Sequence, residues 1–131
     1  MEKLIGRKIL SAKINQSKDV VILETDEGNL YLEWTGDCCA HCYLANVAGA
    51  DCLAGSTVLE VYNAEWIASK NGEYDVVESM GTNIKTTKGY VSFESRVEHN
   101  GYYSGSLTLH DDYNHLSNEI RNQEFKTLEI G

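Results

Sequence analysis

Apolar and polar residues alternate over much of this chain with a period of two, the repeat of a strand with one buried face. The clearest runs cover residues 8–14, 20–25 and 29–34, and they are rich in β-branched and aliphatic residues. Asp26, Glu27 and Gly28 separate the second run from the third. Because glycine adopts positive φ without steric penalty, this turn predicts a hairpin between those two strands.

The second half of the chain alternates in the same way, with strands expected at residues 43–47, 57–66, 74–78, 90–97 and 105–109. Asn71 and Gly72 predict a two-residue hairpin that returns the chain antiparallel at residues 74–78. The Asn100-Gly101 pair predicts that the last two strands also form a hairpin. Residues 50–54 predict a single helical turn with Gly55 as its C-cap, and residues 116–121 predict the start of a short helix.

Together these runs predict a mostly β protein, or α+β with minor helix. We expect one antiparallel β-rich domain of seven to nine strands with one or two short helices, as a sandwich or partly open barrel. A length of 131 residues fits one domain over residues 1–131, and a hydrophobic fraction of 42% allows one core. The chain has no proline, so its eleven glycines must supply most of the tight turns.

Charge is distributed unevenly along the chain. The net charge is −9, with +4 in residues 1–18 and −13 in the remainder. The net negative charge of residues 19–131 disfavours direct binding of nucleic acid, which needs clustered Lys and Arg. The same charge is compatible with binding to a basic surface of another protein. We identify neither a signal peptide nor an apolar run of membrane-spanning length, so we expect a cytoplasmic protein with reduced thiols and no membrane partner.

All four cysteines fall between Cys38 and Cys52. Cys39 and Cys42 form a C-x-x-C that can bind Zn²⁺, with Cys52 and His41 or Cys38 completing a tetrahedron. Only one such pair is present, and adjacent Cys38 and Cys39 point to opposite faces of an extended chain. A thioredoxin-like site needs a helix that the pattern does not predict. A Cys-His nucleophile and simple buried thiols remain open, and we expect no bound metal or cofactor.

Several aromatic and polar residues are candidates for ligand binding. Tyr102 and Tyr103 follow Asn100-Gly101 at the expected hairpin end, where one ring can pack inward and the other can meet a ligand. Lys88 and Lys85 near Tyr90 offer positive charge to a phosphate. The remaining candidates stand at the end of the third strand: Trp34 and Asp37. The chain contains no recognisable catalytic motif, so we expect a protein that is not an enzyme.

Four strings beside the Asp37-Cys38-Cys39 motif complete a wider pattern: residues 26–28 (DEG) before an alternating strand, residues 87–91 (TKGYV), residues 100–104 (NGYYS) and residues 53–59 (LAGSTVL). With them the chain resembles a small uncharacterised domain found in bacteriophages and their bacterial hosts. The resemblance covers about residues 3–110 and leaves residues 111–131 as a C-terminal extension. In that family pattern Cys38 and Cys39 recur but Cys42 and Cys52 do not, which weakens the zinc interpretation. The resemblance implies an accessory protein that antagonises host defence.

Two hypotheses about function follow from these observations. The first is a non-enzymatic, homo-oligomeric binding protein that sequesters a small nucleotide-like signal in the host cytoplasm. The second is an acidic inhibitor that binds a host defence protein or a nucleic-acid-binding protein. Self-association is expected because a β-rich domain leaves sheet edges that can pair with another copy.

Overall fold

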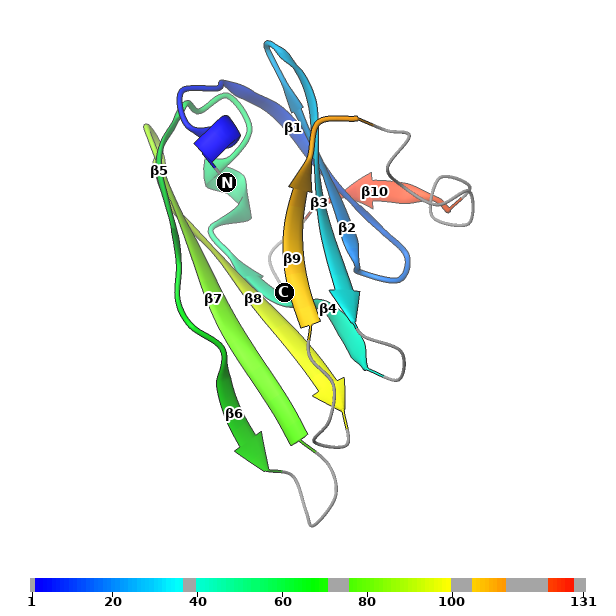
Figure 1. Ribbon diagram of the computed structural model, residues 1–131. Coiled ribbons are helices and arrows are strands. Elements are labelled where there is room, and N and C mark those ends of the chain that lie inside the picture. Colours follow the sequence, from blue (N-terminus) through cyan, green and yellow to red (C-terminus); the bar gives the residue numbers. More distant parts are fainter. Residues whose placement is uncertain (1, 37–39, 71–75, 100–104, 113–122, 129–131) are drawn as a thin grey trace.

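The computed structural model describes residues 2–36, 40–70, 76–99, 105–112 and 123–128. Most of these residues lie in two antiparallel sheets that face each other across one core (Figure 1). Two short 3-10 turns accompany them, η1 (Glu2–Leu4) and η2 (Ala50–Cys52). The predicted mostly β architecture is therefore confirmed, as a two-sheet arrangement in which the described strands do not close into a barrel.

The first sheet has the strand order β10-β1-β2-β3-β9. Its strands are β1 (Ile9–Asn15), β2 (Val20–Thr25), β3 (Gly28–Gly36), β9 (Gly105–His110) and β10 (Phe125–Thr127). The hairpin predicted between β2 and β3 is confirmed. Thr25 pairs with Gly28, whose φ of 112° lies in the region that glycine tolerates best.

The second sheet has the order β4-β8-β7-β5, with β6 also paired to β7. Its strands are β4 (His41–Ala48), β5 (Val58–Asn63), β6 (Ile67–Lys70), β7 (Val76–Thr86) and β8 (Gly89–His99). The strands predicted at residues 43–47 and 90–97 are present, and η2 supplies the predicted helical turn. Leu53, rather than Gly55, occupies the C-cap of η2.

The run predicted as one strand over residues 57–66 is divided in the structure. β5 ends at Asn63, whose Oδ1 accepts a 2.7 Å hydrogen bond from the Thr82 hydroxyl, and β6 begins four residues later. Lys70 pairs with Val76, so the two-residue hairpin expected at Asn71-Gly72, which would pair Lys70 with Glu73, is wrong. The antiparallel return itself is confirmed. The eleven-residue β7 decides this arrangement, because it pairs with both β5 and β6 along one edge.

The last two predicted strands are correct as elements but wrong as a pair. β8 pairs with β7 and β4, whereas β9 crosses to the first sheet and pairs with β3. A period of two shows that a segment is a strand, but it does not identify the neighbour of that strand. The expected helix at residues 116–121 lies outside the described residues.

The C-terminal segment is built into the fold. β10, which the sequence did not predict, pairs antiparallel with β1 through Lys13–Thr127, Ile14–Lys126 and Asn15–Phe125. Leu128, immediately after β10, is buried and donates its backbone N–H to the Ala12 carbonyl at 3.0 Å. Residues 123–128 are therefore part of the domain rather than an appendage to it.

Inward side chains of both sheets form one hydrophobic core, to which Leu23, Leu32, Leu44, Ile84, Val91 and Phe93 contribute. Backbone hydrogen bonds tie the two sheets together at both sides. Ile9 donates to the Ser56 carbonyl at 2.8 Å on one side, and Leu44 donates to the Lys18 carbonyl at 2.7 Å on the other. These links hold the edges of the sandwich together although the strands do not form a continuous barrel.

Three of the five cations in residues 1–18 meet carboxylates from elsewhere in the chain: Lys3 with Asp111 at 2.6 Å, Arg7 with Glu27 at 3.6 Å and Lys13 with Glu24 at 2.9 Å. Hydrogen bonding to Lys13 is the main reason that the pKa of Glu24 is lowered. Such surface pairs contribute little to stability, but they place these three cations beside opposite charges from the rest of the chain.

Over the part of the chain that the structure describes, no helix has the length and apolarity needed to span a bilayer.

Candidate functional site

Trp34 is a core residue and not a ligand-binding residue, which corrects the sequence prediction. Its side chain is 2% exposed, and its ring meets Phe93 edge-on with centroids 6.4 Å apart. The indole Nε1–H donates a 2.6 Å hydrogen bond to the Ser95 hydroxyl, which is also buried. The position on β3 turns this side chain inward, where no ligand can reach the ring.

Tyr90 and Lys88 lie together at one end of the second sheet. Tyr90 is 65% exposed on the outer face of β8, and Lys85 of β7 is its register partner. Lys88 stands in the turn between these strands, and its ammonium donates a 2.8 Å hydrogen bond to the Ala54 carbonyl. The proximity of Tyr90 and Lys85 is confirmed, but Lys88 is engaged with the backbone of the loop after η2.

The other ligand-binding candidates, Asp37, Asn100, Tyr102 and Tyr103, lie outside the described residues, as does Cys39. The strand ends that flank them come together: Gly36 of β3 pairs with Gly105 of β9. His99, which precedes residues 100–104, lies about 30 Å along β8 from Tyr90, at 3.3 Å per residue. The structure therefore separates Tyr90 and Lys88 from the strand ends that flank the other candidates.

The zinc candidates within the described residues are separated. Cys42 pairs with Val97 near one end of β8. Cys52 lies at the opposite end of that strand, with its Sγ 3.8 Å from the Lys88 carbonyl. Among the described residues no three His, Cys, Asp or Glu side chains gather as a ligand set. Cys42 and Cys52 therefore cannot bind one metal ion together in this fold.

His41 belongs to a polar cluster on the outer face of β4 and β8. Its ring stacks on Tyr43 with centroids 4.6 Å apart, and the Tyr43 hydroxyl donates a 3.1 Å hydrogen bond to Glu98. Burial, followed by the Glu98 hydrogen bond, raises the pKa of Tyr43. Arg96 pairs with Glu94 at 3.3 Å, and its pKa is raised chiefly by its hydrogen bond with Tyr43. One guanidinium meets two carboxylates here, so the cluster does not suit an anion.

The buried Cys42 thiol makes stability depend on pH in alkaline solution. Burial raises its pKa to about 11, and the Cys42 Sγ lies 3.9 Å from the Ser106 carbonyl. Below about 8.5, the pKa of a cysteine thiol in the unfolded chain, the Cys42 thiol is protonated in both the folded and the unfolded state, so its ionisation does not change the free energy of unfolding. Above it only the unfolded thiol ionises, and stability falls as pH rises toward 11.

We expect the wild-type protein to lose on the order of 2 kcal/mol more unfolding free energy than a Cys42→Ala variant between pH 8 and 11. Urea unfolding of both proteins across this range measures the difference. The other residues that titrate in alkaline solution are present in both proteins, so their contribution to the pH dependence of the unfolding free energy cancels in this comparison. Parallel pH profiles would show that Cys42 is not held protonated by the fold.

A network of side-chain hydrogen bonds surrounds the turn between β1 and β2. Asn15 is 1% exposed, and its Oδ1 accepts hydrogen bonds from the backbone N–H groups of Asp19 and Val20 at 3.1 and 3.0 Å. Its Nδ2 donates to Asp19 Oδ1 at 2.6 Å and to Gln123 Oε1 at 3.0 Å. Gln123 also accepts a 3.1 Å bond from the Ser17 hydroxyl. Asn15 thus shapes the turn and ties the C-terminal segment to it.

A pocket of about 420 Å³ lies between this turn and β10. We call it the turn pocket; its lining residues are Ile14, Asn15, Gln16, Lys18, Glu124, Phe125 and Lys126. Lys18 adopts a φ of 60° in the turn, and its carbonyl is bound by Leu44 of β4, which fixes its backbone. Phe125 packs beside Val20 and Tyr31 on the outer face of the first sheet. The pocket therefore lies between a turn that is hydrogen-bonded to β4 and a ring that packs on the first sheet.

The chemistry of the turn pocket suits a small anion that carries a ring. Lys18 and Lys126 are exposed cations, and neither forms an ion pair with a described residue. Phe125 offers an aromatic surface, and the Gln16 amide can donate and accept hydrogen bonds. The Glu124 carboxylate offsets one of the two cations, so the lining keeps one net positive charge. A volume near 420 Å³ lies within the range of small-ligand sites.

Sequence reasoning missed the turn pocket entirely. Its two halves come from residues 14–18 and 124–126, which are more than a hundred positions apart, and the second half looked like an extension. One signal was present: Phe125, Thr127 and the apolar Leu128 have the composition of a short strand.

The chain matches one domain family, DUF7448, a domain of unknown function, over residues 2–109. This range agrees closely with the extent expected from the sequence motifs. No curated protein and no solved structure matches the chain. Residues 124–126, which line one side of the turn pocket, fall outside the matched range.

Proposed function

We propose that this chain, which belongs to the DUF7448 family of domains of unknown function, is a non-enzymatic binding protein. It sequesters a small nucleotide-like ligand in the turn pocket. In a phage-infected bacterium such binding would antagonise host defence by removing a signal from the cytoplasm. We propose further that the protein self-associates through a sheet edge, which sedimentation velocity tests directly; a monomer at all concentrations opposes it.

One observation carries the proposal: Lys18, Lys126 and Phe125 line the same pocket. A phosphate group between two ammonium groups gains charge-assisted hydrogen bonds from both. A nucleobase on Phe125 gains stacking energy of about 1–3 kcal/mol. The two lysines approach from different segments, so the ligand spans the junction between the β1–β2 turn and β10.

Only part of the turn pocket lies within the residues that match the family. Phe125 and Lys126 lie beyond the matched residues 2–109. The family domain thus supplies the scaffold and the Lys18 half, while residues 123–128 supply the ring and the second cation. Other family members with a different C-terminal segment would then bind a different ligand.

Isothermal titration against a panel of cyclic and linear nucleotides tests this function. We expect one or more to bind, and the Lys18→Ala and Lys126→Ala variants each to weaken binding by roughly tenfold or more. Phe125→Leu keeps an apolar side chain but removes the aromatic ring, so we expect about a fivefold or greater loss.

The matched control for these variants is Lys85→Ala, which removes a cation on the other sheet and should leave binding unchanged. Chromatography of the bound nucleotide should return it intact, since the proposal involves no reaction. Absence of binding by any nucleotide at millimolar concentration, or equal loss in the Lys85→Ala control, would contradict the assignment.

A second candidate function is an acidic inhibitor of a basic host protein. It is favoured by the net charge of −9 and by the ion pairs of Lys3, Arg7 and Lys13, which engage these three cations with carboxylates of the same chain. Pull-down from host lysate distinguishes the two functions: an inhibitor retains a partner at low salt and loses it at high salt, with no nucleotide required. A lysate that yields no partner at low salt removes this candidate.

A further inference from the structure

The turn pocket contains a carboxylate that the phosphate contacts described above do not use. Glu124 lines the pocket together with Lys18 and Lys126, and its side chain is exposed. This side chain forms no ion pair or hydrogen bond with another described residue. A carboxylate repels a phosphate group, but it accepts hydrogen bonds from N–H donors. Glu124 is therefore suited to the part of a nucleotide that carries N–H groups, which is the base.

The order of residues at the start of β10 gives a bound nucleotide a direction. Glu124 immediately precedes Phe125, and Lys126 immediately follows it. Consecutive residues of an extended chain lie about 3.3 Å apart along it, so a carboxylate and an ammonium group flank the ring within the length of one nucleotide. Lys18 adds a second cation from the β1–β2 turn. The phosphate is therefore drawn to the lysines, and the base on Phe125 comes close to Glu124.

The pattern of donors and acceptors on a base decides how well it matches a carboxylate. Guanine presents two neighbouring donors, the N1–H and the 2-amino group, and the two oxygens of one carboxylate can accept both. Adenine presents an unprotonated N1 beside its 6-amino group, so a lone pair of the base faces the carboxylate and repels it. Cytosine has the same mixed pattern, and uracil has a single N–H between two carbonyl oxygens. Guanine is therefore the base that matches a carboxylate best.

We propose that Glu124 makes the turn pocket selective for a guanine base, an inference that rests on the nucleotide-binding function proposed above. The N1–H and the 2-amino group donate to the Glu124 carboxylate while the ring stacks on Phe125. The phosphate lies between Lys18 and Lys126. Two cations and one carboxylate leave the lining with one net positive charge, which matches the single negative charge of a cyclic 3′,5′-phosphodiester. Cyclic mononucleotides are therefore the most informative probes.

Isothermal titration with cyclic GMP, cyclic IMP and cyclic AMP tests the selectivity. A base held by two hydrogen bonds is well discriminated, so cyclic GMP should bind at least about fivefold more tightly than cyclic AMP. Hypoxanthine keeps the N1–H but lacks the 2-amino group, so cyclic IMP should be intermediate. GMP should likewise bind more tightly than AMP. Equal affinity for the guanine and adenine forms would overturn the selectivity and leave nucleotide binding in place, whereas absence of binding by every nucleotide would remove the proposed function as well.

Glu124→Gln tests whether this side chain is the source of the selectivity. A glutamine amide pairs with adenine through one donor and one acceptor, which a carboxylate cannot do. The variant should therefore weaken binding of cyclic GMP and strengthen binding of cyclic AMP, so that the preference falls to about twofold or less. An unchanged preference for cyclic GMP would overturn the role of Glu124.

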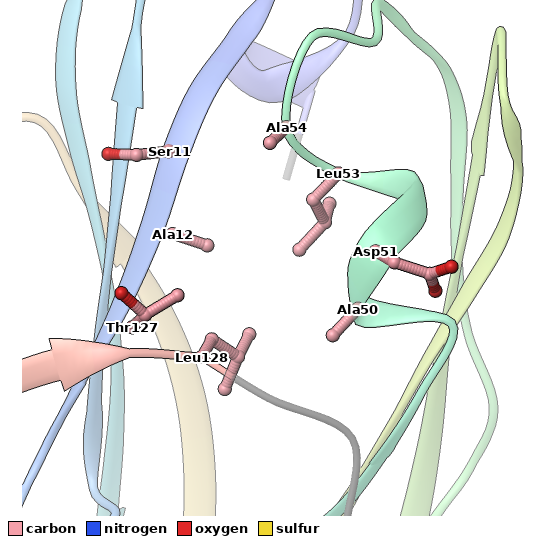
Figure 2. A pocket seen from close by; sticks show the side chains of 8 residues that line it. All are labelled: Ser11, Ala12, Ala50, Asp51, Leu53, Ala54, Thr127 and Leu128. Carbon is pink, nitrogen blue, oxygen red and sulfur yellow. The ribbon is translucent and has the colours of Figure 1, made fainter.

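Asp51→Asn is the matched control, because it removes the same charge from an exposed carboxylate in a different hollow. Figure 2 shows this hollow of about 350 Å³, which lies between β1, η2 and the end of β10 and has Asp51 as the charged residue of its lining. The control should keep the full preference for cyclic GMP. The same loss of preference in Asp51→Asn as in Glu124→Gln would show that net charge, and not contact with the base, decides the selectivity, and it would overturn the proposal.

Discussion

Replacing Trp34 with alanine is expected to lower the free energy of unfolding by about 3–5 kcal/mol, the largest single effect we foresee in this protein. The indole is 2% exposed, so the substitution leaves a large cavity between the two sheets. It also removes the edge-on contact with Phe93 and leaves the buried Ser95 hydroxyl without its 2.6 Å donor. Urea unfolding followed by far-ultraviolet circular dichroism measures the change.

Two further variants separate the contributions of Trp34. Trp34→Phe keeps most of the apolar volume but loses the hydrogen bond to Ser95, and we expect a smaller loss of about 1–3 kcal/mol. Tyr90→Ala serves as the control, because this aromatic side chain is 65% exposed and its removal should change stability by about 0.5 kcal/mol or less. Equal effects of Trp34→Ala and Tyr90→Ala would show that Trp34 is not a core residue.

The second large effect is expected for Asn15→Ala, at about 2–4 kcal/mol of unfolding free energy. The side chain is 1% exposed and takes part in four hydrogen bonds. Alanine would leave the backbone N–H groups of Asp19 and Val20 without an acceptor in a buried setting. It would also release Gln123 from the turn, so the C-terminal segment should exchange its amide hydrogens faster.

The control for this prediction is Asn29→Ala, at an exposed asparagine in the β2–β3 hairpin, where we expect a change of about 0.5 kcal/mol or less. Gln123→Ala should be intermediate, because it removes only the tether. Native-state hydrogen exchange should then show faster exchange in β10 and little change in β7 and β8. Uniform acceleration over all strands in Gln123→Ala would contradict a local tether.

The local features of this fold follow from short stretches of sequence. Alternation of apolar and polar residues identifies β1, β2, β3, β8 and β9, because each strand buries one face and the pattern repeats every two residues. Gly28 sets the β2–β3 hairpin, since the turn needs a positive φ that few other residues adopt. The fold class was therefore determined by local patterning.

Of the residues that the sequence suggested for ligand binding, the proximity of Tyr90 and Lys85 was predictable from local pattern. These two residues lie opposite each other on strands joined by a short turn, so their pairing depends only on the neighbouring strand. The prediction that Trp34 binds a ligand was wrong because local pattern does not say which face of β3 is buried. Alternation places successive residues on opposite faces of the strand, but packing against the second sheet decides which of those faces lies in the core. The Ser95 hydroxyl that accepts its hydrogen bond comes from β8, sixty-one positions away.

By itself, the sequence determined most of the strands, the β2–β3 hairpin and the extent of the family domain, because these features depend on residues close together in the chain. Only the tertiary structure decided that β9 pairs with β3 instead of β8 and that β10 completes the first sheet. It also decided that the turn pocket forms beside β10. The physical reason is the same in each case. Strand pairing and pocket walls arise from contacts between distant segments, and those contacts are chosen by the packing energy of the whole chain rather than by local preference.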